Sequence, residues 1–523
     1  MRPRVLLPIV LQLMLGLAGC ATLPENLPKG PAGKAMSPQT TGTLAGLETQ
    51  LQPKAGADGS SFHLLDSNED ALRWRLALVD TAEHSLDLQY YFWFADDSGD
   101  LLMKHVFDAA DRGVKVRIIL DDISTWIEKR NTPKVRDWEA AVLNAHPNIE
   151  LRLFNPWRSR SHAGRVVEFV RHMGRANQRM HNKVMIADNR ASILGGRNIG
   201  DEYFGYAEDS NFRDLDVLGV GPVARQSSDV FDRFWNSSWV VQVKELMLHP
   251  KRQDVRAQKR SLVDTAKDST VLQRFPLERG DWHAAVADLP ASVDAGRSRV
   301  VTDVPAASPT DGASRAVRHR MPAAMRELMA SAQKELLIDN SYVIPEPVDI
   351  SLFRELTARG VKIKLLTNSL ASQDVPAVNS HYKQWRKELL GAGIELYESR
   401  SDAAIQPLVA DTPPTHAEFM GLHVKAIVVD GTRVFIGSMN LDRRSNDLNS
   451  EMGVLVESEP LGRRVSALME RDMRPENAWR LSLNSRGRVE WAAQDQTLTR
   501  QPARSVWQRL QDLLFMLFPK SLY

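Results

Sequence analysis

The order of apolar and polar positions predicts strands that alternate with helices along most of the chain. A helical pattern starts at the cap-like stretch SNED, residues 67–70, and the strand pattern SLDLQYYFWF follows at 85–94. Two further strand patterns, RGVKVRIILDD at 112–122 and IELRLFN at 149–155, come later in the same series. This alternation is typical of α/β proteins, in which helices cover a parallel or mixed sheet.

The same series of patterns occurs a second time in the C-terminal part of the chain. KELLIDNSY at 334–342 matches the first strand, RGVKIKLLTNS at 359–369 matches the second almost letter for letter, and IELYES at 394–399 matches the third. Internal repetition of this kind predicts two copies of one structural unit. We therefore expect an α/β fold of two pseudo-symmetric halves, each a mixed β-sheet sandwiched by helices.

Changes in composition set the expected boundaries of these halves. The N-terminal half is predicted over residues 61–240 and the C-terminal half over residues 321–485. Residues 241–320 have poor periodicity and contain clusters such as PAASPTDGAS, so we interpret them as a connecting segment. Residues 486–523 form a C-terminal extension, in which SVWQRLQDLLFMLFPKSLY has apolar residues at helical spacing. This amphipathic helix either lies on a membrane surface or packs on its own domain.

The N-terminus has the pattern of an exported protein. Residues 1–19, MRPRVLLPIVLQLMLGLAG, combine two arginines with an apolar run that is too short for a convincing membrane span, and they predict a signal peptide. Cys20 is the chain's one cysteine, so it cannot form an intramolecular disulfide. Its place after Leu-Ala-Gly resembles a bacterial lipobox, whose cysteine is lipidated.

We therefore expect a lipoprotein anchored through Cys20 at the periplasmic face of a bacterial membrane, with a plainly secreted protein as the alternative. Ala21 follows the cysteine, and the absence of aspartate there resembles lipoproteins sorted to the outer membrane. Residues 20–60 are rich in Pro, Gly, Thr, Ala and Lys, and they predict a flexible tether.

Overall composition limits the class of partner. With 43% hydrophobic and 25% charged residues, the 523-residue chain is expected to be globular. Its formal net charge of +2 is too balanced for a protein that coats nucleic acid, so we expect no nucleic-acid partner. Any recognition of anions has to be local.

One short motif occurs twice, at matching places in the two halves. Four of the thirteen histidines are followed two residues later by lysine, but only two of these continue into an aspartate and a glycine-bearing turn that ends in asparagine. The first copy comprises His181, Lys183, Asp188, Gly195 and Asn198, and the second comprises His423, Lys425, Asp430, Gly437 and Asn440. On a strand, residues two apart point to the same face, so each histidine is expected to face the same way as its lysine.

Two such hairpins related by a pseudo-dyad would bring both sets of histidine, lysine and asparagine into one pocket, and this set suits a phosphodiester. One imidazole can attack phosphorus to form a covalent phosphohistidine, while the other protonates the departing alkoxide and later deprotonates the incoming hydroxyl. The lysines and asparagines can hold the equatorial oxygens, where charge accumulates. That stabilisation requires no metal and no cofactor.

Four carboxylates are candidate supporting residues, and a fifth is the alternative to one of them. A nucleophilic histidine requires a carboxylate on its other ring nitrogen, and the candidates are Glu451 and Asp214, with Asp216 as the alternative to Asp214. Asp188 and Asp430 stand in Asp-Asn and Asp-Gly dipeptides, which are typical of tight hairpins, so we expect them to act at least partly as turn formers.

The doubled His-x-Lys-x4-Asp motif with its trailing glycine and asparagine resembles that of the phospholipase D superfamily. SLDLQYYFW, GGRNIGDEYF, FRDLDVLGVGPV and SMNLDRRSNDLNSEMG further resemble the bacterial cardiolipin synthases of the C type. The resemblance implies the phospholipase D fold with the active site at the interface of the halves. It also implies transfer of a phosphatidyl group from phosphatidylethanolamine to phosphatidylglycerol, with His181 as nucleophile and His423 as acid and base.

Two features depart from the C-type pattern: the lipobox with its long tether, and Asn379, where that pattern leads us to expect a histidine. Either departure is compatible with a different acceptor. The alternatives are a hydrolytic phospholipase D, a nuclease of the same superfamily and a catalytically silent lipid-binding scaffold. The near-neutral charge and the membrane anchor disfavour the nuclease, and the two intact motifs disfavour the scaffold. Transfer and hydrolysis use identical machinery.

A basic segment precedes the first motif. Residues 157–179 contain six arginines and one glutamate. Such a segment is either a contact for anionic headgroups or a solvated helix face.

Overall fold

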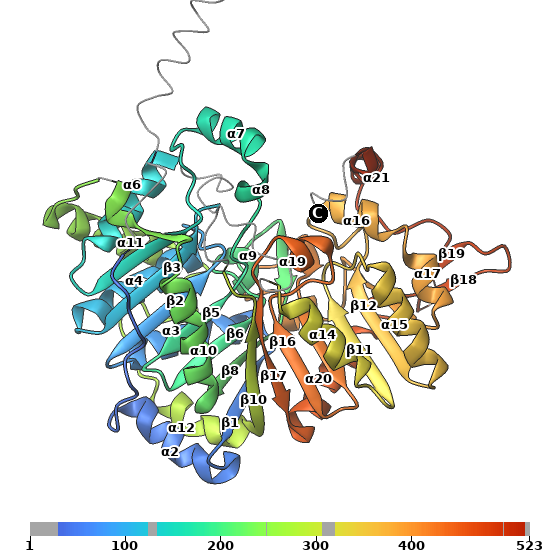
Figure 1. The fold of residues 1–523 in the computed structure, drawn as a ribbon, viewed down its shortest axis with the longest axis horizontal. Coiled ribbons are helices and arrows are strands. Elements are labelled where there is room, and N and C mark those ends of the chain that lie inside the picture. Colours follow the sequence, from blue (N-terminus) through green and yellow to red (C-terminus); the bar gives the residue numbers. More distant parts are fainter. Residues whose placement is uncertain are drawn as a thin grey trace, which may run out of the picture.

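The computed structural model describes residues 23, 30–123, 133–246, 248–305, 319–494 and 496–517. The predicted signal peptide (residues 1–19) and Cys20 lie outside the described residues. Within the described part of the chain, the strands form an 18-stranded mixed sheet and a separate two-stranded parallel sheet. Figure 1 shows the strands of the N-terminal half fanning out to the left and those of the C-terminal half to the right.

The large sheet runs continuously through both halves. In the N-terminal half its spatial order is β9 (Val240–Gln242), β4 (Ile149–Phe154), β3 (Lys115–Asp121), β2 (Ser85–Tyr90), β5 (Val184–Ala187), β6 (Ala191–Gly195), β8 (Asp216–Val220) and β1 (Gly59–Leu65). It continues through β10 (Asp294–Thr302), β17 (Met452–Glu457), β16 (Arg433–Gly437), β15 (Lys425–Val429), β11 (Glu335–Asn340), β12 (Lys362–Asn368), β13 (Glu395–Ser399), β18 (Ala478–Leu483), β19 (Val489–Ala493) and β20 (Gln496–Leu498). The small sheet pairs β7 (Ser210–Arg213) with β14 (Phe419–Leu422).

The two halves of the large sheet meet at its centre and have the same strand order on either side. β1 pairs with β8 and β10 pairs with β17, while β1 and β10 pair with each other in antiparallel register. The connecting segment predicted over residues 241–320 therefore supplies a strand, β10, that joins the two halves of the sheet. The order β3, β2, β5, β6, β8 in one half has its counterpart in the order β12, β11, β15, β16, β17 in the other.

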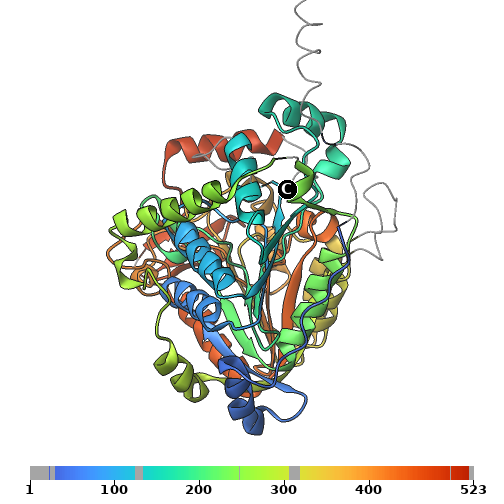
Figure 2. The same ribbon diagram turned by 90° about the vertical axis from the view of Figure 1, so that its left-hand side faces the viewer.

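Helices lie on either side of the strands (Figure 2). In and before the N-terminal half they are α2 (Thr43–Ala55), α3 (Asn68–Thr81), α4 (Asp97–Asp111), α6 (Pro133–Asn144), α7 (His162–Arg171), α8 (Met173–Ala176), α9 (Asp201–Phe204) and α10 (Pro222–Trp235). The connecting segment contains α11 (Arg252–Asp268) and α12 (His283–Ser292). The C-terminal part contains α14 (Met321–Ala330), α15 (Pro347–Ala358), α16 (Pro376–Tyr382), α17 (Arg386–Gly391), α18 (Gln406–Val409), α19 (Arg443–Asp447), α20 (Glu459–Asp472) and α21 (Val506–Leu514).

Alternating residues of β5 and β15 supply different cores, as the period of a strand requires. Met185 of β5 packs in the core that includes α3 and α4, whereas Val184 packs in the core that includes α10. Ile427 of β15 packs with α14 and α15, whereas Val428 joins the same core as Val184. That shared core contains residues of α10 and α20 from both halves, so the halves are held together by common apolar packing.

The flexible tether predicted for residues 20–60 does not hold for its C-terminal part. Residues 43–55 form helix α2, and β1 begins at Gly59. Leu44, Leu47 and Leu51 lie on one side of α2 and are buried in the core with α3. The prediction relied on the abundance of Gly, Thr and Pro and overlooked three leucines at helical spacing. Burial of these leucines holds the segment against the core.

Candidate active site

Each motif histidine is held against the opposite half by the backbone. The amide N of His181 donates to the carbonyl O of Ser450 at 2.8 Å, and the amide N of His423 donates to the carbonyl O of Arg213 at 2.7 Å. His181 lies three residues before β5, and His423 lies between β14 and β15. Neither histidine is within the strand on which the spacing argument put it. These two equivalent contacts lie on either side of the pseudo-dyad and fix the register of the interface.

The residues that follow Ser450 and Arg213 are the two candidate carboxylates, so the same register sets each carboxylate beside a histidine of the other half. His181 Nδ1 lies 2.9 Å from Glu451 Oε2, and His423 Nδ1 lies 2.6 Å from Asp214 Oδ2. The alternative carboxylate Asp216 is paired with Arg75 at 2.8 Å. The histidine–carboxylate pairs therefore cross between the halves, and each pair requires both halves to be docked.

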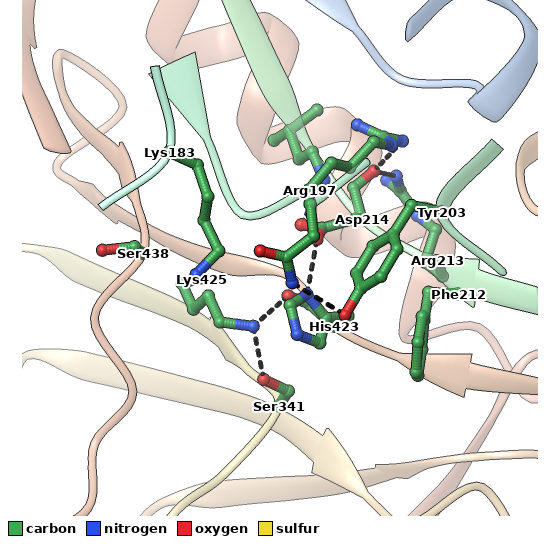
Figure 3. Close-up of polar contacts among 12 residues, drawn as sticks. Lys183, Arg197, Tyr203, Phe212, Arg213, Asp214, Ser341, His423, Lys425 and Ser438 are labelled. Atoms are coloured by element: carbon green, nitrogen blue, oxygen red, sulfur yellow. Dashed lines mark hydrogen bonds and ion pairs between the residues drawn. The ribbon is translucent and has the colours of Figure 1, made fainter. Parts of the chain in front are cut away.

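Lys183 and Lys425 extend from the two halves toward the same place, beside His423 (Figure 3). Lys183 Nζ donates to the carbonyl O of His181 at 2.7 Å and lies 5.3 Å from the centre of the Tyr91 ring. Lys425 Nζ donates to Ser341 Oγ at 2.9 Å and to the carbonyl O of His423. Both side chains are buried, and neither forms an ion pair with a carboxylate of the described residues. A buried cation without such a partner favours binding of an anion.

Burial and the neighbouring lysines hold both imidazoles in the neutral form. Burial lowers the pKa of His181 well below its ordinary value of 6.5, and the charges of Lys183 and Lys425 lower it further. Burial and Lys425 lower the pKa of His423 to about 4, although Asp214 acts in the opposite direction. Burial also lowers the pKa of each lysine. A bound phosphodiester anion would favour the protonated form of the two lysines and, with the charge of Asp214 beside it, of His423.

The two carboxylates differ in their charge state. Burial raises the pKa of Glu451 to about 7. Burial also acts to raise the pKa of Asp214, but His423 and Lys425 outweigh this effect and hold that pKa below its ordinary value. His423 therefore faces a permanent negative charge, whereas the charge beside His181 changes near neutral pH.

The sequences of the two loops give the two carboxylates different surroundings, and the hydroxyl donors beside Glu451 lower its pKa without outweighing the effect of burial. Ser438 Oγ donates to Glu451 Oε2 at 2.5 Å, and Ser445 Oγ donates to Glu451 Oε1 at 2.9 Å. The position that matches Ser438 in the first copy is Gly196, where a Cβ would lie 2.5 Å from Asp214 Oδ1. The first loop passes too close to its carboxylate to carry a side chain.

His181 Nδ1 also lies 3.1 Å from the carbonyl O of Ser438. Because a carbonyl oxygen can only accept, the proton of the neutral ring resides on Nδ1, and Nε2 keeps its lone pair. A neutral imidazole with a free Nε2 is the form that a nucleophile requires.

The motif asparagines belong to the same network. Asn198 Nδ2 donates to the Tyr203 hydroxyl at 2.9 Å, and Asn198 Oδ1 accepts from the amide N of Phe92 at 3.1 Å. Asn440 Oδ1 accepts from Ser341 Oγ at 2.9 Å. The rings of Tyr203 and His423 meet edge to face with their centres 5.3 Å apart. Both asparagines are buried. Each side-chain amide group has two hydrogens, and Asn198 uses one of them on Tyr203, so the second remains for a phosphate oxygen.

Asp188 and Asp430 lie at the turns of their hairpins, about 20 Å along the strand from the histidines at the rise of an extended chain. Asp188 accepts from the amides of Glu83, His84 and Ser85, and Asp430 accepts from those of Gln333, Lys334 and Glu335. Both aspartates have positive φ, 51° and 53°. Their side chains tie each hairpin to the start of the neighbouring strand, which agrees with the turn-forming part of the prediction.

Several residues of the network carry no motif that the sequence analysis used. Ser341 and Tyr91 follow matching strands, β11 and β2, and contact the two lysines. Ser445 and Tyr203 lie in the short helices α19 and α9, which follow the two asparagines. A signal was available in SMNLDRRSNDLNSEMG, where three serines precede the carboxylate. Which of them donate to Glu451 could not be assigned without the fold.

Comparison with known proteins agrees with this geometry. The family model described as "Cardiolipin synthase, PLD-like domain" matches residues 76–235 and 325–473. The chain is 35% identical over 462 residues to cardiolipin synthase C of Escherichia coli, with 87% of this chain and 94% of that protein covered. It is 23% identical over 472 residues to cardiolipin synthase A of Erwinia tasmaniensis, with 89% of this chain and 76% of that protein covered.

The crystal structure of phosphatidylserine synthase from Haemophilus influenzae superposes on this chain with a TM-score of 0.53 at 12% sequence identity. The superposed part covers 82% of this chain and 91% of that chain. The predicted fold class and the predicted family resemblance are thereby confirmed. The chain belongs to the cardiolipin synthase family of phospholipase D-like phosphodiester transferases.

Proposed function

We propose that the chain is a phosphatidyltransferase that makes cardiolipin from two phospholipids through a covalent phosphohistidine. The observation that carries this proposal is the pair of buried lysines, one from each half, which have no ion-pair partner among the described residues and lie beside both histidines. A phosphodiester supplies the negative charge that these groups lack. We propose six catalytic residues: His181, Lys183, Asn198, His423, Lys425 and Asn440.

In the first step, Nε2 of neutral His181 attacks phosphorus of the donor lipid. The P–N bond forms, the bond from phosphorus to the headgroup oxygen breaks, and His423 gives its proton to the departing alkoxide. The lysines and the asparagine amides stabilise the charge on the equatorial oxygens. The permanently charged Asp214 supports the protonated form of His423, which suits an acid and base, whereas the weaker acid Glu451 suits a histidine that must stay neutral.

In the second step, the hydroxyl of the acceptor lipid attacks the phosphohistidine. His423 takes the hydroxyl proton, a new P–O bond forms, the P–N bond breaks, and His181 returns to its neutral state. The protons balance over the two steps, because His423 gives one and then receives one. If water takes the place of the acceptor, the same steps hydrolyse the lipid to phosphatidic acid.

For the substrates, we propose phosphatidylethanolamine as donor and phosphatidylglycerol as acceptor. The greater identity to cardiolipin synthase C than to cardiolipin synthase A supports a reaction of the C type. The two phospholipase D-like halves are proposed over residues 61–240 and 321–485, which contain the two ranges matched by the family model.

We propose that the protein acts at the periplasmic face of a bacterial membrane, and specifically at the outer membrane, as a lipoprotein anchored through Cys20. The N-terminal sequence supports this location. Among the described residues, the helices are all too short or too polar to cross a bilayer.

The test incubates purified protein with phosphatidylethanolamine labelled in its headgroup and with phosphatidylglycerol, and identifies the products by mass spectrometry. Cardiolipin and free ethanolamine are expected. Phosphatidic acid as the sole lipid product would replace the proposal with hydrolysis. A matched control is His249→Ala, because His249 also precedes a lysine by two residues but is exposed and outside the site.

A further inference from the structure

Two short helices have the reverse burial of an ordinary surface helix: α7 in the N-terminal half and α21 in the C-terminal extension bury polar residues and expose apolar ones. In α7, Val166, Val167 and Val170 are 50%, 48% and 68% exposed, whereas Arg165 and Glu168 are buried. A surface helix of a globular protein normally buries the apolar face and exposes the polar one. The apolar face of α7 is therefore open to a partner.

Helix α21 has the same reversed pattern. Its buried residues are Gln508 and Asp512, while six apolar side chains are 43% to 84% exposed: Val506, Trp507, Leu510, Leu513, Leu514 and, just after the helix, Leu517. The amphipathic helix predicted from the sequence exists, but its polar side packs on its own domain. The apolar side remains unpartnered among the described residues.

Specific contacts fix both helices in this orientation. Asp512 of α21 accepts from Asn379 Nδ2 and from Lys383 Nζ, both at 2.7 Å, and Gln508 Nε2 donates to the carbonyl O of Leu370 at 2.5 Å. Asn379 is the position where the C-type pattern led us to expect a histidine, and its amide is occupied in holding α21. In α7, Glu168 accepts from the amide N of Ser159 at 2.9 Å.

The exposed charges on these helices have one sign. Within α7 the exposed charged residue is Arg171, and within α21 it is Arg509. The acidic residue of each helix, Glu168 or Asp512, is buried. An apolar surface edged by arginine is complementary to a bilayer that contains anionic phospholipids.

Both helices also lie at the same end of the molecule, in both views (Figures 1 and 2). Helices α9 and α19, which follow the motif asparagines, lie below α7 and α21 in Figure 1, near the middle of the molecule. Each helix is connected to the site along the chain. The segment after α8 leads directly to His181, and Asp374, in the segment that holds α21, accepts from the hydroxyl of Tyr342, the neighbour of Ser341.

We propose that α7 and α21 form a two-helix docking surface that sits in the headgroup region of a phospholipid bilayer containing anionic lipid, with the mouth of the active site between them. This inference rests on the proposed function, because a phosphatidyltransferase has to draw both substrates from a bilayer. It assigns the surface that does so, independently of any anchor at the N-terminus.

A fluorescence experiment tests the proposal without using activity. Cys20→Ser removes the one natural cysteine of the full chain, and single cysteines are introduced as Val170→Cys, Leu513→Cys and Val348→Cys. Each carries an environment-sensitive fluorophore, and the protein is reconstituted with vesicles of phosphatidylethanolamine and phosphatidylglycerol. Val348 is the matched control, because it is 51% exposed and belongs to α15, which lies apart from α7 and α21 in Figure 1.

Probes at positions 170 and 513 are expected to emit at shorter wavelength and to be quenched by nitroxide-labelled lipid in the bilayer, whereas the probe at 348 behaves as it does in water. Absence of quenching at positions 170 and 513 would overturn the proposal. A shift to shorter wavelength without lipid quenching would assign the surface to a second copy of the chain instead. Quenching at all three positions alike would mean that the chain has no docking face.

Activity supplies a second readout. The double variant Val170→Asp, Leu513→Asp is expected to lose about tenfold of its turnover on vesicles, because charge at the interface opposes insertion, but to keep its turnover on dissolved short-chain lipids. Equal loss on both kinds of lipid would contradict the proposal. If the unaltered chain turns over neither kind of lipid, the proposed function fails, while the fluorescence result still decides the docking surface.

Discussion

Replacing Asp214 by asparagine keeps the size of the side chain but removes the negative charge that His423 faces across the interface. The two groups are fully buried in contact, with Nδ1 and Oδ2 separated by 2.6 Å. In the proposed reaction, His423 is protonated before it acts as the acid. Because Asp214 raises the pKa of His423 against burial and Lys425, its loss makes the protonated imidazole harder to form.

The size of the effect follows from the strength of the bond that is lost. A hydrogen bond to a charged group contributes about 1.5–3 kcal/mol, and the short, buried geometry favours the upper part of that range. A loss of about 2–3 kcal/mol in the transition state corresponds to a fall in rate of about 30- to 160-fold. The substrate contacts of the lysines and asparagines are unchanged, so the effect should fall on kcat and leave KM nearly constant.

The assay measures initial rates of lipid product formation for the unaltered chain, Asp214→Asn, His423→Ala and the double variant. Since Asp214 acts through His423, adding Asp214→Asn to His423→Ala should change the rate little further. Asp188→Asn is the matched control, because Asp188 is also a buried aspartate of the motif region but lies at the hairpin turn. Full activity of Asp214→Asn, or losses that add in the double variant, would refute the cross-half pairing as a catalytic element.

Three further predictions follow from the same geometry. Asp188→Asn should leave kcat unchanged but lower the free energy of unfolding by about 1–3 kcal/mol, because an acceptor of three backbone amides is lost. Denaturant titration measures this change in stability. A lower rate with unchanged stability would contradict the prediction. His181→Ala should abolish turnover while the circular dichroism spectrum is retained, and activity above about a tenth of the unaltered chain would exclude His181 as nucleophile. In a plot of kcat/KM against pH, the fall on the acid side should lie below pH 6.5, because neutral His181 is lost only as the pH falls through its lowered pKa. Lys183→Met removes a charge that lowers this pKa, so it should move the fall to higher pH where turnover is still measurable. A fall above pH 6.5 in the unaltered chain would contradict a neutral His181.

The sequence predicted the two histidine–lysine pairs and the hairpins because these depend on short-range rules. Residues two apart share a face of an extended chain, and Asp-Asn or Asp-Gly dipeptides adopt the positive φ found at Asp188 and Asp430. The repeat of strand patterns predicted the pseudo-symmetric sheet, since each half has to bury the same faces.

The partners of Glu451 and Asp214 could not be assigned in the same way. Their choice depends on the register between β7 and β14 and on the bridge between Met180 and Ser450, which are contacts between distant parts of the chain. Sequence spacing indicated that both carboxylates are near the site, but it contained no information on which histidine each one faces.

The basic segment at residues 157–179 illustrates the same limit. Neither a solvated helix face nor an open array of arginines describes it fully, because several of its arginines turn inward. Arg160 pairs with Asp122 and Asp137, and Arg179 lies 3.1 Å from Asp121. These acids come from β3, from the turn after it and from α6, so their proximity arises from the fold and not from the local sequence.

The most direct test of the account is to trap and locate the covalent intermediate. The variant His423→Ala, incubated with donor lipid labelled with ³²P, is quenched at alkaline pH, digested and analysed by mass spectrometry. A phosphatidyl group is expected on the peptide that contains His181. It forms slowly, because the acid for the first step is also missing, and it accumulates because the base for the second step is missing. Label on another residue, or turnover that proceeds with no label on His181, would contradict the account.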